Sequence, residues 1–228
     1  MNRNLERVMP HVFRHEGGYV DHPADPGGAT NLGVTLRTLS AWRGRAVNKA
    51  QVRALGPAEA TQIYRRQYWA PVQGDELPGG VDYAVFDFAI HSGPKRAAEY
   101  LQRTVGARVD GQVGVHTLAA VRAADPRDVV ARLCAARLRF LRRIRDRQTK
   151  RRLWDHFGRG WQRRLDEVET LARQLAGEAA GARGKGSVTD VRLPASGLAA
   201  ALLGALRRAL ARLATTLINA FIKPGRSS

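Results

Sequence analysis

Apolar residues recur at helical spacing near the N-terminus and at several later points of the chain. Leu5, Val8 and Val12 lie three or four residues apart, which predicts an amphipathic helix. Pro10 predicts either a kink or a restart inside that helix, and Gly17 predicts its end. The stretch VDYAVFDFAIHSG, residues 81–93, is almost entirely apolar or aromatic and predicts a buried helix.

Further helices are predicted from residues that favour helix starts and ends. Thr35 can cap a helix that runs to Gly44, and Pro57 opens the next one. Another helix is expected over 94–106, with proline at its start and glycine at its end. A long helix is expected to run from Asp125-Pro126 toward Arg147, and a last one over roughly 161–176. The sequence thus predicts a mainly α fold.

The segment between residues 18 and 35 follows a different pattern. Glycine, proline, aspartate and asparagine alternate there with single apolar residues such as Val20, Leu32 and Val34. This pattern predicts turns and short strands, so we expect one small, irregular β-hairpin inside the helical domain.

The composition changes at residue 177. Residues 177–196 are rich in glycine, alanine and serine without apolar periodicity, which predicts a flexible linker. Residues 197–223 have about the length of a membrane span, but Arg208 and Arg212 would be costly at a bilayer centre. We interpret 197–223 as a C-terminal basic amphipathic helix that lies on an anionic membrane surface. The alternative is a helix that packs on the core or on its copy in a dimer.

The chain is strongly basic, with 38 Lys and Arg against 20 Asp and Glu and a formal net charge of +18. Such a charge favours polyanionic partners, among them nucleic acid, anionic lipid and acidic cell-wall polymers. The densest basic run is RLRFLRRIRDRQTKRR, residues 137–152, which is either a contact surface or simply a solvated helix face. No zinc-finger, RNP or bZIP pattern accompanies it, so we expect no specific nucleic-acid binding.

Cys134 is the single cysteine, and it lies inside an apolar pattern. An intramolecular disulfide and a cysteine zinc cluster are therefore excluded, and Cys134 is expected to be a small buried side chain. The sequence shows no phosphate-binding loop and no His/Asp/Glu metal motif, so we expect no cofactor. The N-terminus has no apolar core typical of a signal peptide, so we expect synthesis in the cytoplasm without a standard export signal.

Glu16 is the first candidate for chemistry. It shares a helix face with Val12 and Phe13, where burial would favour the protonated carboxyl that a general acid needs. The following loop returns Asp25, an ionised carboxylate, and Thr30, a hydroxyl that could hold a water. Two carboxyl groups in unequal surroundings are typical of glycoside hydrolases. The alternative is a Glu16 that pairs with an arginine beside a glycine-rich turn of no special purpose.

The same stretch, HEGGYVDHPADPGGATNLGVT (residues 15–35), resembles the signature of glycoside hydrolase family 108, the N-acetylmuramidases found as phage endolysins. YRRQYW (64–69) and VDYAVFDFAIHSGPKRAAEYLQ (81–102) resemble helices that wall the family's cleft. VDGQVGVHTLAAV (109–121) is similar to an element of the predicted peptidoglycan-binding region that accompanies the family. The resemblance covers residues 5–175.

The resemblance implies a lysozyme-like fold in which 1–93 form the catalytic region and 94–176 form the peptidoglycan-binding region, packed as one globule. It assigns the general acid to Glu16 and implies hydrolysis of the β-1,4 bond between N-acetylmuramic acid and N-acetylglucosamine. The order of Glu16, Asp25 and Thr30 is also similar to that of the catalytic residues in phage-type lysozymes.

Several residues are candidates for contacts with the sugar chain. Aromatic rings stack on sugar faces, and we expect about half of the candidates to do so while the rest pack in the core. His91 stands where the family commonly has asparagine, and Asp87 and Ser92 are expected to point toward the same wall as His91. The full set is Tyr19, Tyr64, Tyr68, Trp69, Tyr83, Asp87, His91 and Ser92.

Peptidoglycan is accordingly the expected partner of a chain that we expect to be monomeric and to reach the cell wall after holin-type release. Three alternatives remain open. A lytic transglycosylase also uses one glutamate, and a non-catalytic wall-binding module would need none. The nucleic-acid alternative depends on charge alone.

Overall fold

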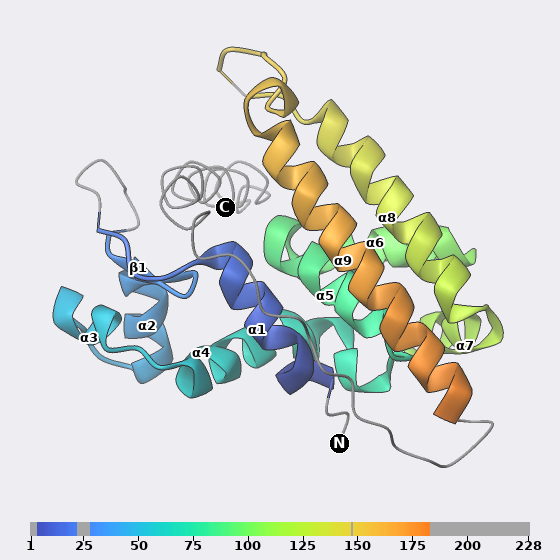
Figure 1. Ribbon diagram of the computed structural model, residues 1–228, viewed down its shortest axis with the longest axis horizontal. Coiled ribbons are helices and arrows are strands. Elements are labelled where there is room, and N and C mark those ends of the chain that lie inside the picture. Colours follow the sequence, from blue (N-terminus) through green and yellow to red (C-terminus); the bar gives the residue numbers. More distant parts are fainter. Residues whose placement is uncertain (1–3, 22–27, 147, 183–228) are drawn as a thin grey trace, which may run out of the picture.

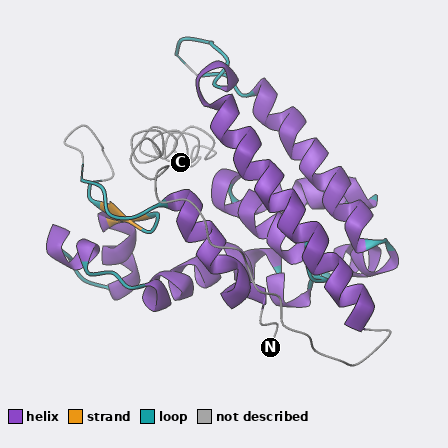
Figure 2. Cartoon of the chain, in the orientation of Figure 1, coloured by secondary structure: helices purple, strands orange, loops and turns teal. Residues whose placement is uncertain are grey.

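The computed structural model describes residues 4–21, 28–146 and 148–182, and within them the chain is mainly α-helical (Figures 1 and 2). The predicted mainly α fold with one small β-hairpin is confirmed. The predicted linker and the amphipathic helix at 197–223 lie outside the described residues. Among the described helices, none is both long and apolar enough to cross a membrane.

Helix α1 (Asn4–Glu16) runs through Pro10 without a restart. Its buried side chains include Leu5, Val8 and Val12, as the spacing predicts. Proline removes only one backbone hydrogen bond, and the buried apolar residues on both sides of Pro10 hold the helix in place. Gly17 ends the helix with a φ of 75°, and its N–H donates to the Phe13 carbonyl at 2.6 Å.

The hairpin consists of β1 (Thr30–Asn31) and β2 (Val34–Thr35), which pair antiparallel with Thr30 opposite Thr35. Leu32 and Gly33 form the turn with positive φ values of 50° and 76°, the backbone signs of a type I′ turn. Val20 makes an isolated bridge to Thr30 and extends this small sheet.

Short helices surround the hairpin. Helix α2 (Leu36–Arg43) is capped by the Thr35 side chain and ends at the left-handed Gly44. Helix α3 (Lys49–Arg53) was not predicted, and its capping box is made by Asn48 and Gln51. Both belong to the part of the molecule that carries β1 in Figure 1.

Helix α4 (Pro57–Tyr64) continues into a π-helical turn, η1 (Arg65–Trp69), and two 3₁₀ turns, η2 (Ala70–Val72) and η3 (Gly74–Glu76). A π-helical turn changes the direction in which the following side chains point. Tyr68 and Trp69 lie in this turn, and Tyr64 directly precedes it. The rings of Tyr64 and Trp69 both contact Phe86.

Helix α5 (Val81–Ser92) is the centre of the molecule, because all twelve of its residues are buried. The predicted buried helix is thereby confirmed. It packs against α1, α6 (Pro94–Val105), α8 (Pro126–Arg143) and α9 (Trp154–Ala182). The largest buried apolar cluster draws on residues from α1 through α9.

Helices α8 and α9 lie side by side along much of their length (Figure 1). Helix α8 ends at Arg143, before the predicted Arg147, and a short turn with an Arg145–Arg152 bridge follows. Helix α9 is longer than the predicted 161–176 at both ends. At its N-terminal end, Trp154 and Phe157 pack against the cluster that contains Trp161. Helix α7 (Val115–Ala123) lies between α6 and α8 in sequence and contacts both.

Cys134 is buried in the core, as expected, and burial raises the pKa of its thiol to about 12.

Candidate active site

Glu16 lies at the C-terminal end of α1, where its side chain is 7% exposed. The hairpin turn packs directly against it. A Cβ added to Gly33 would stand 3.1 Å from both Cβ and Cγ of Glu16 and would overlap the Tyr64 hydroxyl. Only glycine therefore fits at this position, and the hairpin and the end of α1 enclose the carboxyl group together.

The carboxyl group of Glu16 has a buried cationic partner. Nη1 of Arg164, on α9, donates to Oε1 of Glu16 at 2.7 Å. Oε2 makes no hydrogen bond to the described residues. The face of α1 around Glu16 is therefore not purely apolar, and the pairing with an arginine that the sequence left open as an alternative is what the structure contains.

Arg164 also binds Asp87 on α5. Its Nε donates to both carboxylate oxygens, at 3.2 Å to Oδ1 and 3.0 Å to Oδ2, and its Nη2 donates to Oδ2 at 2.8 Å. A single guanidinium therefore connects two buried carboxyl groups that are far apart in sequence. The planar fork of arginine donors suits such a bridging position.

Arg137 on α8 completes the cluster. Its Nη1 donates to Asp87 Oδ1 at 2.7 Å, and the side chains of Arg137 and Asp87 are 3% and 0% exposed. We call Glu16, Asp87, Arg137 and Arg164 the buried ion-pair cluster. With Glu16 as a carboxylate, two carboxylates and two guanidinium groups balance in charge, which is the condition under which ions can be buried.

The pKa shifts agree with this charge balance. Burial by itself would raise the pKa of Asp87, but Arg164 and Arg137 outweigh it and hold that pKa well below its usual range. Burial would lower the pKa of Arg164, and the charges of Asp87 and Glu16 raise it instead. Both groups therefore stay ionised across the physiological range.

His15, the neighbour of Glu16, is neutral at pH 7. Burial, followed by the positive charge of Arg164, lowers its pKa from 6.5 to about 4. Its Nε2 lies 3.5 Å from Glu167 Oε2 but makes no hydrogen bond there. The geometry resembles an ion pair, yet a neutral imidazole cannot form one, so this contact adds little stability.

Two predicted tyrosines lie beside Glu16. The Tyr64 hydroxyl donates to the Leu32 carbonyl at 3.0 Å and so fixes the hairpin turn. Burial, and then the nearby charge of Glu16, raises the pKa of Tyr68 to about 12. Tyr68 is half-buried and packs on Tyr64 at 5.6 Å between ring centroids. It therefore remains a protonated phenol close to the carboxyl group.

Of the other predicted catalytic residues, the structure describes Thr30. Thr30 begins β1, and its hydroxyl donates to the Gly28 carbonyl at 3.4 Å. Asp25 lies outside the described residues. Asp21 is described, and its carboxylate contacts the Lys49 ammonium at 3.1 Å. Tyr19 is half-buried, with the Arg53 guanidinium 4.2 Å from its ring centroid.

The remaining predicted sugar contacts lie in the core. Trp69 and Tyr83 are at most 1% exposed, and the Trp69 indole N–H donates to Asp75 at 3.0 Å. Asp87 belongs to the buried ion-pair cluster. These surroundings favour the alternative of core packing, which the sequence left open for part of the set.

His91 and Ser92 are also buried, at the end of α5. The His91 ring meets Trp161 edge-on at 5.5 Å, and its Nδ1 lies 3.3 Å from the Ser92 hydroxyl. Burial lowers the pKa of His91 well below 6.5, so the ring is neutral. The contact of His91 and Ser92 with the sugar chain therefore stays a prediction.

Arg137, Arg164 and Gly33 are site residues that the sequence reasoning missed. A periodic signal for the arginines exists: Arg164 follows Trp161 by three and precedes Val168 by four, so it lies on the apolar stripe of its helix. Arg137 lies four residues after Leu133 and four before Leu141 on α8, so it also lies on an apolar stripe. A carboxylate inside the apolar run of α5 also requires a buried cation.

The described residues contain no cluster of three or more His, Cys, Asp or Glu side chains that could hold a metal ion. The arrangement instead provides one enclosed carboxyl group held by an arginine, next to a phenol and a hairpin that carries hydroxyl groups. Such a carboxyl group can give up and take back a proton.

Comparisons with known proteins relate the chain to cell-wall enzymes. Residues 9–93 match the family model described as Glycosyl hydrolase 108, and residues 96–166 match the one described as Predicted Peptidoglycan domain. A solved structure of SagA from Brucella abortus is 49% identical, with a TM-score of 0.66. The match covers 79% of this chain and 99% of that one. A search of curated proteins found no match.

Proposed function

This chain belongs to glycosyl hydrolase family 108, and we propose that Glu16 is the proton donor with which it cleaves the glycan strands of peptidoglycan. The family and the SagA relationship make the chain a glycoside hydrolase, an N-acetylmuramidase of the lysozyme type that acts on peptidoglycan. The role of Glu16 is our assignment. It depends chiefly on one observation, the enclosed carboxyl group whose Oε1 is held by Arg164.

The geometry gives the two oxygens of Glu16 different tasks. Arg164 fixes Oε1 and thereby the orientation of the whole carboxyl group, so Oε2 is the oxygen that can take up a proton and pass it on. When this proton passes to the glycosidic oxygen, the bond to the sugar breaks and Glu16 becomes a carboxylate. Arg164 then stabilises the new negative charge, because it already donates to the same group.

Arg164 is in this proposal a positioning residue. Asp87 binds Arg164, and Arg137 binds Asp87. The position of the Glu16 carboxyl group therefore depends on residues from α5, α8 and α9. Residues 137 and 164 fall in the region matched by the peptidoglycan-domain model, while Glu16 falls in the catalytic one. The two matched regions therefore build one site between them.

A second carboxylate is expected to stabilise positive charge at the sugar or to orient water, and we propose Asp25 for this task, with Thr30 holding the water. Asp21 is the competing candidate on the same loop. We expect Asp25→Asn to lower the hydrolysis rate far more than Asp21→Asn. If only Asp21→Asn is inactive, the two assignments must be exchanged.

The test of the acid is Glu16→Gln, which keeps the shape of the side chain and removes the transferable proton. Release of soluble fragments from purified sacculi should fall by about 10²- to 10⁴-fold. Glu167→Gln is the matched control, because it makes the same substitution on a partly exposed carboxylate of α9. Sacculus clearance by Glu16→Gln at nearly the wild-type rate would show that another group is the acid.

Mass spectrometry of the released fragments separates hydrolysis from lytic transglycosylation. Hydrolysis leaves a reducing muramic acid end, whereas transglycosylation leaves a 1,6-anhydro end without consuming water. We expect the reducing end. Anhydro ends as the main product would overturn the hydrolytic assignment but not the role of Glu16.

We further propose that the protein acts as a monomer on the wall after holin-type release, and that residues 197–223 bind an anionic membrane surface. Deletion of residues 196–228 should leave hydrolysis of purified sacculi unchanged and weaken co-sedimentation with anionic vesicles. Each basic residue near such a surface contributes about 1 kcal/mol, so the binding should decrease as salt is added. Equal vesicle binding by both forms would contradict the membrane assignment.

A further inference from the structure

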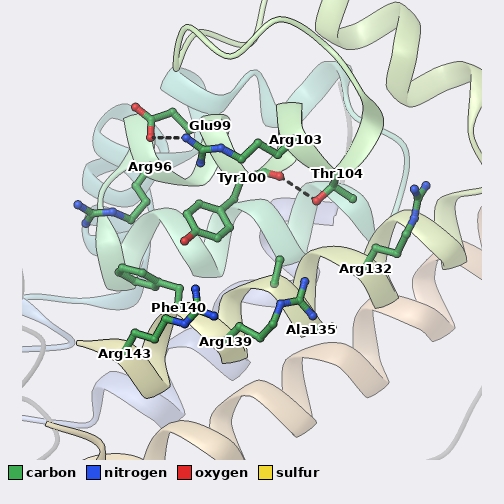
Figure 3. A pocket seen from close by; sticks show the side chains of 11 residues that line it. Arg96, Glu99, Tyr100, Arg103, Thr104, Arg132, Ala135, Arg139, Phe140 and Arg143 are labelled. Atoms are coloured by element: carbon green, nitrogen blue, oxygen red, sulfur yellow. Dashed lines mark hydrogen bonds and ion pairs between the residues drawn. The ribbon is translucent and has the colours of Figure 1, made fainter. Parts of the chain in front are cut away.

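Helices α6 and α8 border a groove that is separate from the buried ion-pair cluster (Figure 3). Its volume is about 730 Å³. We call it the arginine groove, because five arginines line it against a single acidic residue, Glu99. These arginines are Arg96, Arg103, Arg132, Arg139 and Arg143.

The arginines of the groove differ in how far their charges are already neutralised. Arg132 pairs with Asp128 at 2.9 Å, and Arg103 contacts Glu99 at 3.8 Å. Arg139 and Arg143 are exposed, and neither has an acidic partner among the described residues. The groove therefore presents at least two uncompensated guanidinium groups, one helical turn apart on α8, to a ligand.

The floor between the two helices is aromatic and ordered by packing. The rings of Tyr100 and Phe140 lie 5.6 Å apart, and Figure 3 shows them between the arginines of the two helices. The Arg96 guanidinium lies 5.1 Å from the Phe140 centroid and donates to the Ser92 carbonyl at 3.2 Å. Arg96 is therefore a fixed, half-buried cation, whereas Arg139 and Arg143 can adjust to a ligand.

We propose that the arginine groove binds the acidic peptides that branch from the peptidoglycan strands, while Glu16 acts on the glycan. This inference rests on the proposed function, which brings the protein against peptidoglycan. Those peptides combine carboxylates with small apolar side chains such as the methyl group of alanine. Arginine forks bind carboxylates by paired hydrogen bonds, and the Tyr100–Phe140 floor offers apolar contact between them.

The shape of the groove favours a peptide over a membrane. A membrane-binding surface presents protruding apolar side chains, but this site is concave and its aromatic rings lie at its floor. The only large apolar side chains exposed in the described part of the chain are Val109 and Val115, and neither lines the groove. Anchoring the peptide would hold the wall against the enzyme during successive cleavages.

The test is a binding measurement with the full-length chain and a disaccharide–peptide fragment of peptidoglycan. The fragment is N-acetylglucosamine linked to a muramic acid that carries its peptide, so it has no bond of the type that an N-acetylmuramidase cleaves. Arg139→Gln combined with Arg143→Gln should weaken its binding about tenfold, as expected for two partly solvated charge-assisted hydrogen bonds. Arg37→Gln combined with Arg45→Gln is the control, since it removes the same charge from exposed positions outside the groove.

Two further ligands test whether the groove recognises the carboxylates of the peptide. The same fragment with amidated carboxylates, and the disaccharide without its peptide, should bind the wild type more weakly and should not distinguish it from the groove variant. The proposal is overturned if the groove variant binds the acidic fragment like the wild type, or if it loses binding only to anionic vesicles or duplex DNA. Because the readout is binding, an active Glu16→Gln protein would disprove the catalytic assignment without affecting this result.

Discussion

The buried ion-pair cluster and the arginine groove use the same residue type in opposite ways. Arg137 and Arg139 are two residues apart on α8, yet Arg137 is 2% exposed and bound to Asp87, while Arg139 faces solvent. A two-residue step on a helix turns the side chain by about 200° to the other face. Position on the helix, rather than residue type, therefore decides whether an arginine holds the site together or is available to a ligand.

The energetic consequences of the two positions also differ. Burying a charge costs several kcal/mol unless a partner compensates it, so the removal of one partner leaves the whole penalty on the other. An exposed arginine has no such penalty, because water replaces any lost contact. Substitutions in the two regions should consequently differ in size by severalfold.

The largest effect is expected at the centre of the cluster. Arg164→Met should lower the free energy of unfolding by about 3–5 kcal/mol, because Glu16 would lose its cation and Asp87 one of two. Urea unfolding followed by circular dichroism measures it. Arg163→Met is the matched control on the exposed face of α9 and should stay within about 0.5 kcal/mol of the wild type. Equal losses of unfolding free energy in the two variants would show that the ion pairs of Arg164 do not stabilise the fold.

A smaller effect is expected at the hairpin turn that encloses Glu16. Gly33 and Gly44 both have positive φ, 76° and 66°, so alanine at either position should cost about 1 kcal/mol in backbone strain. Only the alanine at 33 would also press on Glu16 and on the buried Tyr64, which adds about 1–3 kcal/mol.

Gly33→Ala should therefore lower the urea midpoint more than Gly44→Ala, and it alone should reduce sacculus hydrolysis, by about tenfold or more, because it displaces the acid. Hydrolysis by both variants at the wild-type rate would show that the turn does not position Glu16.

The third effect depends on pH. His15 has a pKa of about 4 in the folded chain against 6.5 for an unperturbed imidazole, so the unfolded chain binds more protons between these values. Stability is then fully present above about pH 6.5 and decreases as the pH falls toward 4. The depressed pKa of His91 acts in the same direction, and that of Asp87 continues the loss at lower pH.

The His15→Gln variant should lack the part of this pH-dependent loss of stability that His15 causes, which is on the order of 2 kcal/mol between pH 7 and pH 4. Unfolding free energies measured at both pH values test this, with the exposed His116→Gln as control. An unchanged difference between the two pH values in His15→Gln would contradict the burial of a neutral imidazole beside Arg164.

The smallest effect is expected in the arginine groove. Arg139→Met combined with Arg143→Met should change the free energy of unfolding by no more than about 0.5 kcal/mol, because both side chains are exposed and unpaired within the described part of the chain. Urea unfolding checks this value too. A loss above about 2 kcal/mol would make these arginines structural and would remove the contrast with Arg137.

Much of the fold could be read from local patterns. The apolar run at 81–93 predicted α5, the proline and glycine pair around 94–106 predicted α6, and Thr35 predicted the start of α2. Boundaries were less accurate at α8 and α9, where the apolar stripe and the charged residues overlap. The short α3 has no apolar periodicity, and its capping pair, Asn48 and Gln51, was not enough by itself to predict a helix.

The sequence by itself determined the helical character, the hairpin and Glu16 as the candidate acid, because spacing, turn residues and a motif of neighbouring residues are local properties. Only the tertiary structure showed that Arg164 holds Glu16 from 148 positions away and that Asp87 is paired rather than available to sugar. Whether Arg137 or Arg139 is buried depends on how α5, α8 and α9 pack. A buried charge is tolerated only where its counterion arrives from another element, and that meeting is a property of the folded chain.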